Sequence, residues 1–293
     1  MADAAPPRNS SRTALGVAAL RAVHQLLDGE PKILDDPIAA RLLDADVLQQ
    51  LRSNPARPHE PLTKGLRSHV VLRNRYAEER MAQAVQRGVR QCVLLGAGFD
   101  TFAYRQPDWA RSLRIYEVDH QATQEDKRHR LQSAGIPIPA NLEFVAIDFE
   151  SASLRQGLQT STLNFSQPVF FSCLGVLVYL TREAADAVFA LVAAFPASSE
   201  IVFTFSTPQS SLSGNEAESQ AALAGLVNSI GEPWQTYFDP QTLINDLHAL
   251  GFSDISFLSS EAAEQTYFQR RSDGLQAPRR GGIGAAIVGA HPS

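Results

Sequence analysis

Apolar residues divide the chain into an N-terminal stretch with helical spacing and a longer stretch in which short apolar runs alternate with helical patterns. From residue 91 onward, the apolar runs have the length and composition of buried strands. Strands are expected at residues 92–95, 113–119, 142–148, within 168–180, and at 200–205, 252–258 and 283–290. Because strands alternate with helices, we predict an α/β fold with a doubly wound, mostly parallel sheet of seven strands.

The first ninety residues predict helices instead of strands. Apolar residues recur there at helical spacing, and three prolines between residues 53 and 63 indicate a loop. We expect residues 13–90 to form a helical cap over the ligand edge of the sheet, after a loose polar tail at residues 1–12. The helices expected in the cap are residues 13–28, 37–51 and 66–88.

One segment of the core region, residues 91–293, departs from the alternation. Residues 207–231 are polar and rich in small side chains, with a helical pattern at 216–230. We interpret this segment as a lid or as part of the cap. The other helices expected in the core are residues 121–134, 182–195 and 240–250.

Composition narrows the functional classes. A net charge of −5 over 293 residues argues against a nucleic-acid partner, because nucleic-acid-binding surfaces carry a basic excess. No apolar run reaches about 18 residues, so no membrane span is expected. Cys92 and Cys173 both lie in strand-like runs, which favours buried reduced thiols, a cytoplasmic setting and no metal site.

The stretch QCVLLGAGFDT, which begins at residue 91, carries the strongest indication of a ligand site. Its apolar half predicts a buried strand, and Gly96, Ala97 and Gly98 follow at the carboxyl end of that strand. Glycines at this position let the backbone turn sharply and approach a ligand closely. Asp100 and Thr101 are then expected to cap a following helix. This edge binds ligands in open α/β sheets, so we predict a nucleotide-type cofactor pocket.

Two cofactor classes share this architecture. A Rossmann dinucleotide site uses G-x-G-x-x-G, but Thr101 stands where the third glycine would be. Asp119 ends the next strand and suits either class, because a carboxylate accepts hydrogen bonds from ribose hydroxyls. Asp148 and Phe149 follow the third strand and suit an adenine pocket, with the acid accepting from the exocyclic amine and the ring packing on the purine. The alternative for Asp148 is a cap for a helix that starts near Ser151.

Two arginines on the helix at residues 66–88 differ in their helical phase. Arg73 falls on the apolar stripe, where an unpaired charge is costly, so it needs an anionic partner, an internal ion pair or a path to solvent. Arg75 falls on the polar side, four residues before Glu79, where an ion pair is natural.

Seven motifs together resemble the leucine carboxyl methyltransferase-like branch of class I S-adenosylmethionine-dependent methyltransferases, and more narrowly a large bacterial group in that branch. The resemblance runs from about residue 11 to residue 290 and implies a Rossmann-like fold with S-adenosylmethionine as the cofactor. The motifs are SRTALGVAALRA (11–22), LDDPIAARLL (34–43), LRNRYAEERM (72–81), VLLGAGFDTFAYR (93–105), YEVDH (116–120), AIDF (146–149) and GVLVYL (175–180).

The resemblance implies roles for residues on both sides of the expected pocket. Arg73 is similar to the family arginine that pairs with the carboxylate of S-adenosylmethionine, with Arg75 as a second candidate and Arg21 as a looser match. The glycine turn, Gly96 to Gly98 with Ala97 between, would approach the methionine part.

On the nucleoside side, the resemblance places Asp119 on the ribose hydroxyls, and Asp148 and Phe149 around the adenine.

One position departs from the family pattern. Several members have a glutamate where this chain has Leu174, and that position contacts cofactor or acceptor, so the acceptor side can differ here.

The resemblance implies an O-methyltransferase that acts on a carboxylate or hydroxyl of a small molecule or peptide. A carboxylate acceptor is ionised at neutral pH and needs no general base, whereas a hydroxyl acceptor needs one within hydrogen-bond reach. The candidate bases are His120 and His69, and Tyr179 is a candidate border of the acceptor site; for each, ordinary packing is the alternative. Two other functions stay open at this point, an NAD-type oxidoreductase and a non-catalytic binding protein.

Overall fold

The computed structural model describes residues 10–54, 56–150, 153–279 and 281–290. Within these ranges, seven strands form one sheet in the order β3-β2-β1-β4-β5-β7-β6. β1 to β5 are parallel and β7 is antiparallel to both of its neighbours, which confirms the predicted mostly parallel sheet. The strands are β1 (Gln91–Leu95), β2 (Arg114–Asp119), β3 (Leu142–Ala146), β4 (Phe170–Cys173), β5 (Glu200–Phe205), β6 (Phe252–Phe257) and β7 (Gly282–Val288).

The strand order reverses between β1 and β4, which is where open α/β sheets form a crevice for ligands. Leu95 at the end of β1 is in register with Val118 of β2 and with Cys173 of β4. The loops that leave these three strands therefore start from the same edge of the sheet. β1, β4 and β5 are buried along their whole length, as their continuous apolar runs predict.

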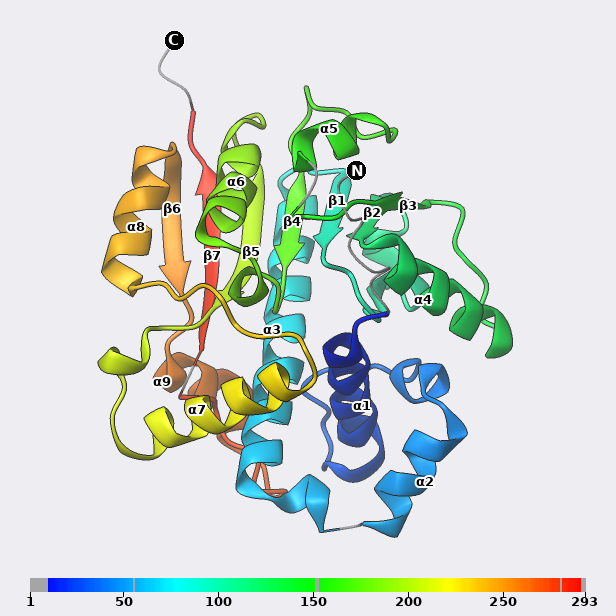
Figure 1. The fold of residues 1–293 in the computed structure, drawn as a ribbon. Coiled ribbons are helices and arrows are strands. Elements are labelled where there is room, and N and C mark those ends of the chain that lie inside the picture. The colour runs from blue at the N-terminus through cyan, green and yellow to red at the C-terminus, as the bar shows by residue number, and fades with distance from the viewer. Residues whose placement is uncertain (1–9, 55, 151–152, 280, 291–293) are drawn as a thin grey trace, which may run out of the picture.

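Helices cover both faces of the sheet (Figure 1). One face packs against α5 (Leu154–Gln159), α6 (Arg182–Ala193) and α8 (Pro240–Ala249) in a large apolar cluster. The other face packs against the C-terminal half of α3 (Pro61–Gln86), where Ala77, Met81 and Ala84 are buried. The remaining helices are α1 (Arg12–Leu27), α2 (Ala45–Ser53), α4 (Gln121–Ser133), α7 (Gly214–Ser229) and α9 (Ser260–Ala263), which a π-turn over Glu264–Phe268 extends.

The connection from β1 to β2 contains no α-helix, so the expectation that Asp100 and Thr101 cap one is wrong. Asp100 Oδ1 instead accepts a hydrogen bond of 2.8 Å from the backbone N–H of Phe102 and stabilises only a 3₁₀ turn. A second 3₁₀ turn follows at Asp108–Ala110. The physical reason is that α3 already covers this face of the sheet, and both turns pack beside it in the same apolar cluster.

The helix expected at residues 37–51 is broken in two. A 3₁₀ helix spans Ala39–Leu42 and α2 starts at Ala45, with Leu43 in an extended backbone conformation between them. Leu42 packs with the core under α4, whereas Leu43 packs against α1. The chain leaves the helical path because these neighbouring side chains are buried in different clusters.

The loop expected at residues 53–63 is shorter than predicted. A 3₁₀ turn at Arg57–His59 lies within it, and α3 begins at Pro61, five residues earlier than expected. Proline is tolerated at the first helical position because its missing N–H would have no helical partner there. The predicted buried stripe of α3 is confirmed at Val70, Ala77, Met81 and Ala84, while Leu66 is half-buried.

The two cysteines are confirmed as buried and free. Burial raises the pKa of both thiols, which makes them unreactive at neutral pH. In the part of the chain that the structure describes, no helix is both long and apolar enough to cross a membrane. Residues 1–9 of the expected tail lie outside the described residues, and Ser11 already caps α1 by accepting a hydrogen bond from Ala14 N.

Candidate functional site

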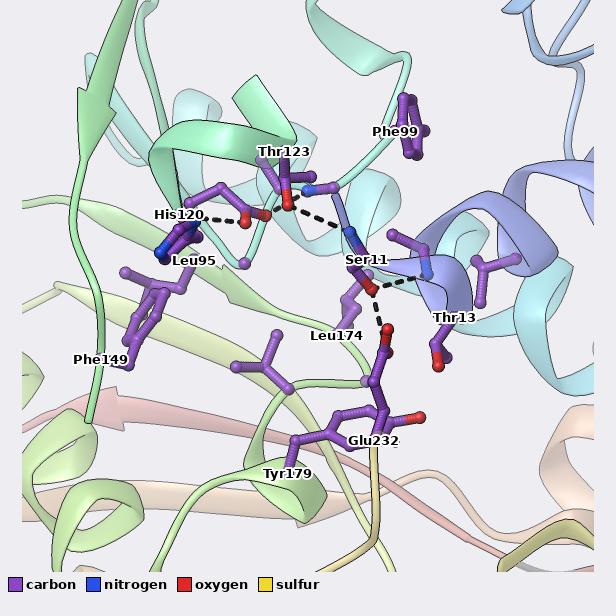
Figure 2. A pocket seen from close by; sticks show the side chains of 18 of the residues that line it. Ser11, Thr13, Leu95, Phe99, His120, Thr123, Phe149, Leu174, Tyr179 and Glu232 are labelled. Atoms are coloured by element: carbon purple, nitrogen blue, oxygen red, sulfur yellow. Dashed lines mark hydrogen bonds between the residues drawn. The ribbon is translucent and has the colours of Figure 1, made fainter. Parts of the chain in front are cut away.

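A cavity of about 640 Å³ opens at the carboxyl edge of the sheet, where β1, β2 and β4 end (Figure 2). Its volume lies in the range of about 300–1,000 Å³ that is typical of small-molecule sites. The walls come from the glycine turn after β1, the ends of β2 and β3, the turn after β4, the start of α1 and the segment after α7. We call this space the first cavity.

The glycine turn forms one wall of the first cavity. Gly96 and Gly98 both adopt positive φ angles, of 63° and 47°, which favour glycine. A Cβ at Gly96 would lie 2.3 Å from a methyl carbon of Val176, and a Cβ at Gly98 would lie 3.1 Å from the Cβ of Ala14. These glycines are therefore required by two neighbouring segments of the protein itself. Ala97, between them, also lines the cavity.

Asp119 lies at the end of β2, beside the glycine turn. Its Oδ2 accepts a hydrogen bond of 2.6 Å from Gly98 N, and its Oδ1 accepts one of 2.7 Å from His120 N. Burial raises the pKa of Asp119 above its ordinary value, and these two backbone N–H groups oppose that shift. A carboxylate has about four acceptor sites, so Asp119 can still accept two hydrogen bonds from a ligand in the cavity.

Asp148 and Phe149 line the cavity beyond the end of β3, and both are half-buried. Asp148 Oδ1 accepts a hydrogen bond of 3.1 Å from Glu150 N. The alternative role for Asp148 as the cap of the next helix is wrong, because α5 begins at Leu154 and is capped by Ser153. Ser151, named in that alternative, lies outside the described residues.

Arg73 differs from the other deeply buried arginines of the cap. Arg21 pairs with Asp36 at 2.9 Å, and Arg67 pairs with Asp28 at 2.7 Å. Arg73 has no carboxylate partner of this kind in the described ranges, and its Nε has no hydrogen-bond partner there. Burial lowers its pKa to about 10, so the side chain stays cationic at neutral pH. Asp100, on the same cavity wall, acts on Arg73 only at a distance. A buried cation without a direct ion-pair partner indicates a site for an anionic ligand group.

The turn after β4 holds Arg73 in place. Gly175 has a φ of 73°, and a Cβ there would lie 2.6 Å from one guanidinium nitrogen of Arg73. Gly175 N donates a hydrogen bond of 2.7 Å to Thr204 Oγ1, which fixes the turn to β5. The sequence reasoning assigned no role to Gly175, because it lies inside the apolar run at residues 168–180 and only the structure shows that β4 ends before it. Leu174 lines the first cavity beside this turn.

Arg75 does not reach the cavity, so its assignment as a cofactor residue is not supported. Its side chain is exposed and pairs with Glu79 at 2.6 Å, as its helical phase predicts. Arg21 lines the cavity, but its guanidinium is occupied by Asp36 and by the carbonyl of Phe99. Of these three arginines, Arg73 is the one that lines the cavity without a direct ion-pair partner among the described residues.

The candidate bases separate in space. His120 lines the first cavity and caps α4, with its Nδ1 accepting a hydrogen bond of 3.3 Å from Ala122 N. His69 lies on α3 and lines a second cavity that adjoins the first. Tyr179 lines both cavities, and burial raises the pKa of its phenol.

A closure over the first cavity was not foreseen from the sequence (Figure 2). Glu232, in the segment after α7, accepts hydrogen bonds of 3.0 Å from Ser11 Oγ and 2.8 Å from Arg12 N. Ser11 N also donates to Thr123 Oγ1 of α4 at 3.4 Å. These contacts join residues more than 100 positions apart, and isolated polar residues in a sequence carry no pattern that predicts such pairs. Among the described residues, no group of three or more His, Cys, Asp or Glu side chains is placed to hold a metal ion.

Comparison with known proteins places this geometry in a family. The model of the leucine carboxyl methyltransferase family matches residues 14–193, which include α1, the glycine turn, Asp119, Asp148 and the turn after β4. YktD of Bacillus subtilis, named as an inferred S-adenosyl-L-methionine-dependent methyltransferase, is 30% identical over 92% of this chain and 94% of its own length.

Solved structures agree on the fold. A protein of family DUF574 from Streptomyces avermitilis is similar with a TM-score of 0.56 at 15% identity, over 95% of this chain and 98% of that one. A methyltransferase, assigned by inference, from Thermobifida fusca is similar with a TM-score of 0.55 at 17% identity, over 96% of both chains. From the family match and the near full-length relative, the chain belongs to the leucine carboxyl methyltransferase family, a branch of the S-adenosyl-L-methionine-dependent methyltransferases.

Proposed function

We propose that the first cavity binds S-adenosylmethionine and that the protein transfers its methyl group to an oxygen of a carboxylate or hydroxyl acceptor. The observation that carries this proposal is Arg73, a buried cation on the cavity wall that has no direct ion pair among the described residues and whose Nε has no hydrogen-bond partner there. The amino-acid end of the cofactor carries a carboxylate, which would supply that direct partner. The cavity thus has a charge that fits the group it is proposed to hold.

The other lining residues fit the rest of the cofactor. Asp119 would accept hydrogen bonds from the ribose hydroxyls with the acceptor sites that Gly98 N and His120 N leave unused. Asp148 would accept from the adenine amine, and Phe149 would pack against the adenine ring. The turn at Gly96 and Gly98, which also lines the cavity, would lie against the methionine part.

The chemistry favours an acceptor that is already ionised. S-adenosylmethionine supplies a methyl group activated by a sulfonium, so the protein contributes mainly alignment and exclusion of water. Removing a proton from a hydroxyl acceptor would need a base. His120 Nδ1 already accepts a hydrogen bond from Ala122 N, and burial raises the pKa of Tyr179, so its phenol keeps its proton at neutral pH. A carboxylate acceptor needs no base, because it is already ionised.

Calorimetric titration with S-adenosylmethionine, S-adenosylhomocysteine and NAD in parallel tests the cofactor. We expect micromolar binding of the first two ligands and none of NAD. Binding of NAD alone would favour an oxidoreductase on the same scaffold. If none of the three ligands binds, the result would favour a non-catalytic protein.

Replacing Asp119 tests the proposed ribose contact. Asp119→Ala is expected to weaken S-adenosylmethionine binding at least about tenfold, since two lost hydrogen bonds of about 1 kcal/mol each suffice for that change. The control is Asp108→Ala, because the Asp108 side chain is 91% exposed and lies in a surface turn outside the cavity. Equal affinity in a folded Asp119→Ala protein would remove the ribose assignment.

A further inference from the structure

A second cavity of about 420 Å³ adjoins the first one on the side of the helical cap. Its walls are supplied mainly by α1, the N-terminal half of α3 and α7, which lie beyond the carboxyl end of β4 in Figure 1. Its volume also lies in the range of small-molecule sites. The family relationship assigns no ligand to this space.

The two cavities meet at a neck. The residues that line both of them are Arg12, Thr13, Val17, Arg73, Gly175, Tyr179 and Ile230. These residues lie at the end of the first cavity where Arg73 would hold the amino-acid part of the cofactor. A molecule in the second cavity can therefore present one end to the site of methyl transfer while the rest of it stays outside the first cavity.

The second cavity is apolar along most of its wall. Helical side chains on the inner faces of α1, α3 and α7 supply that surface: Leu20, Val23, Leu66, Val70, Leu223 and Val227. On α7, Gln220, Leu223 and Val227 are buried and share one face of the helix. At the mouth, Leu226 exposes 53% of its surface. An apolar cavity of this kind favours a ligand with an apolar body.

The charges around the second cavity have one sign. No Asp or Glu is among its described lining residues, whereas Arg12, Arg57 and Arg73 are. Arg12 and Arg57 are exposed and Arg73 is at the neck. This field disfavours a cationic ligand and favours an anionic one.

The neck also lacks a group suited to removing a proton. Burial raises the pKa of Tyr179, so its phenol is protonated at neutral pH. His69 lies four residues before Arg73 on α3, and it lines the second cavity but is not among the residues that both cavities share. The ligand that fits these features is therefore one whose reacting oxygen is ionised in water.

We propose that the second cavity holds the methyl acceptor, and that this acceptor is a small-molecule carboxylic acid with an elongated apolar body. The inference rests on the proposed function of the first cavity. The carboxylate lies at the neck and the apolar body extends between α3 and α7. A carboxylate oxygen forms a bond to the methyl carbon with its own electron pair as the carbon–sulfur bond breaks. The sulfur keeps that bonding pair, so the products are a methyl ester and a neutral thioether, and no proton is released.

The test uses three probes with the same ten-carbon chain: decanoate, decan-1-ol and decylammonium. Their binding to the full chain is measured calorimetrically, in the presence of S-adenosylhomocysteine. We expect decanoate to bind at least tenfold more tightly than decylammonium, with decan-1-ol between them. Equal binding of the acid and the amine, or no binding of decanoate, would overturn the proposal.

A cavity-filling variant locates the binding. Leu66 is half-buried and lies seven residues before Arg73, on the same face of α3 and two turns away from the neck. Leu66→Trp is expected to weaken decanoate binding at least tenfold and to leave S-adenosylmethionine binding within twofold of the original protein. The control is Leu250→Trp, at a partly exposed leucine that lines neither cavity.

The two titrations separate the two proposals. Unchanged decanoate affinity in Leu66→Trp would overturn the placement of the acceptor, whatever the cofactor does. Failure of S-adenosylmethionine to bind the original protein would instead overturn the proposed function of the first cavity.

Discussion

The walls of the two cavities are formed by different kinds of structural element. The first is made by turns at the ends of parallel strands, where a few charged side chains line the space. The second is made by the apolar faces of helices that come from distant parts of the chain. A turn at a strand end is constrained by the sheet, whereas a helix face can change its side chains freely. The comparison suggests that a shared cofactor is held by the first kind of wall and a particular acceptor by the second.

The two kinds of wall are joined by one buried ion-pair network. Arg21 of α1 donates to Asp36 Oδ2 at 2.9 Å and to the carbonyl of Phe99 at 2.5 Å, and Asp36 Oδ1 accepts from Ala39 N at 3.1 Å. Asp36 is fully buried. The network therefore ties the helices that enclose the second cavity to the turn that borders the first.

Removing the Asp36 carboxylate should break the link between the walls of the two cavities. Among the predicted effects, its effect on stability should be the largest. Asp36→Ala leaves the Arg21 charge buried without its partner, so we expect a loss of about 3–5 kcal/mol in the free energy of unfolding at neutral pH. Denaturant unfolding measures this change. Asp35→Ala, at the exposed neighbouring position, is the matched control and should stay within about 0.5 kcal/mol.

The same variant predicts a dependence on pH. Burial opposes ionisation of Asp36, but the charges of Arg21 and Arg105 outweigh it, so the pKa of Asp36 is lowered from its ordinary value of 3.8. A lowered native pKa contributes stability above the unfolded value, and this contribution is lost as pH falls through the native pKa. The stability gap between the original protein and Asp36→Ala should thus narrow below about pH 4. A stability gap that stays constant as the pH falls well below 4 would contradict the shift.

Arg73 and Arg75 lie on the same helix, α3, and replacing each of them tests whether the cofactor lies in the first cavity. Arg73→Ala should weaken S-adenosylmethionine binding at least about tenfold, because a hydrogen-bonded ion pair contributes about 1.5–3 kcal/mol. Arg75→Ala removes an exposed ion pair with Glu79 and should change binding by less than about twofold. Calorimetry of both variants measures the difference. The reverse order would mean that the cofactor does not lie in the first cavity.

The smallest effect is expected at the closure over the first cavity. Glu232→Ala removes the acceptor for Ser11 Oγ and Arg12 N, each at the partly exposed rim. We expect the dissociation rate of S-adenosylmethionine to rise about threefold to tenfold with little change in its association rate. Glu218→Ala, on the exposed side of α7, is the control in the same surface plasmon resonance measurement. Equal dissociation rates would show that the contact does not retain the ligand.

The sequence predicted the parts of the first cavity that depend on local signals. These signals are the apolar run of β1, the glycines after it and the acid at the end of β2. Each of them lies within or next to the strand that it marks. Buried parallel strands require such runs and such turns, so their pattern is visible without a partner segment. The phase of α3 was predictable for the same reason, since a helix places every third or fourth residue on one face.

Other features depended on contacts between distant segments. No local signal shows that α3 covers the sheet beside β1, and for that reason a helix was expected after Thr101 where only 3₁₀ turns form. The same holds for Gly175, whose importance comes from a guanidinium more than 100 residues earlier in the chain.

By itself, the sequence determined the sheet, the edge at which the first cavity opens and the family of the chain, because strand, turn and motif patterns are local. The tertiary structure alone decided that Arg73 has no direct ion-pair partner among the described residues, and that α1, α3 and α7 enclose a second apolar cavity with arginines around it. Those properties arise from which side chains meet across long loops. That meeting is set by the packing of whole elements and leaves no periodicity in the sequence.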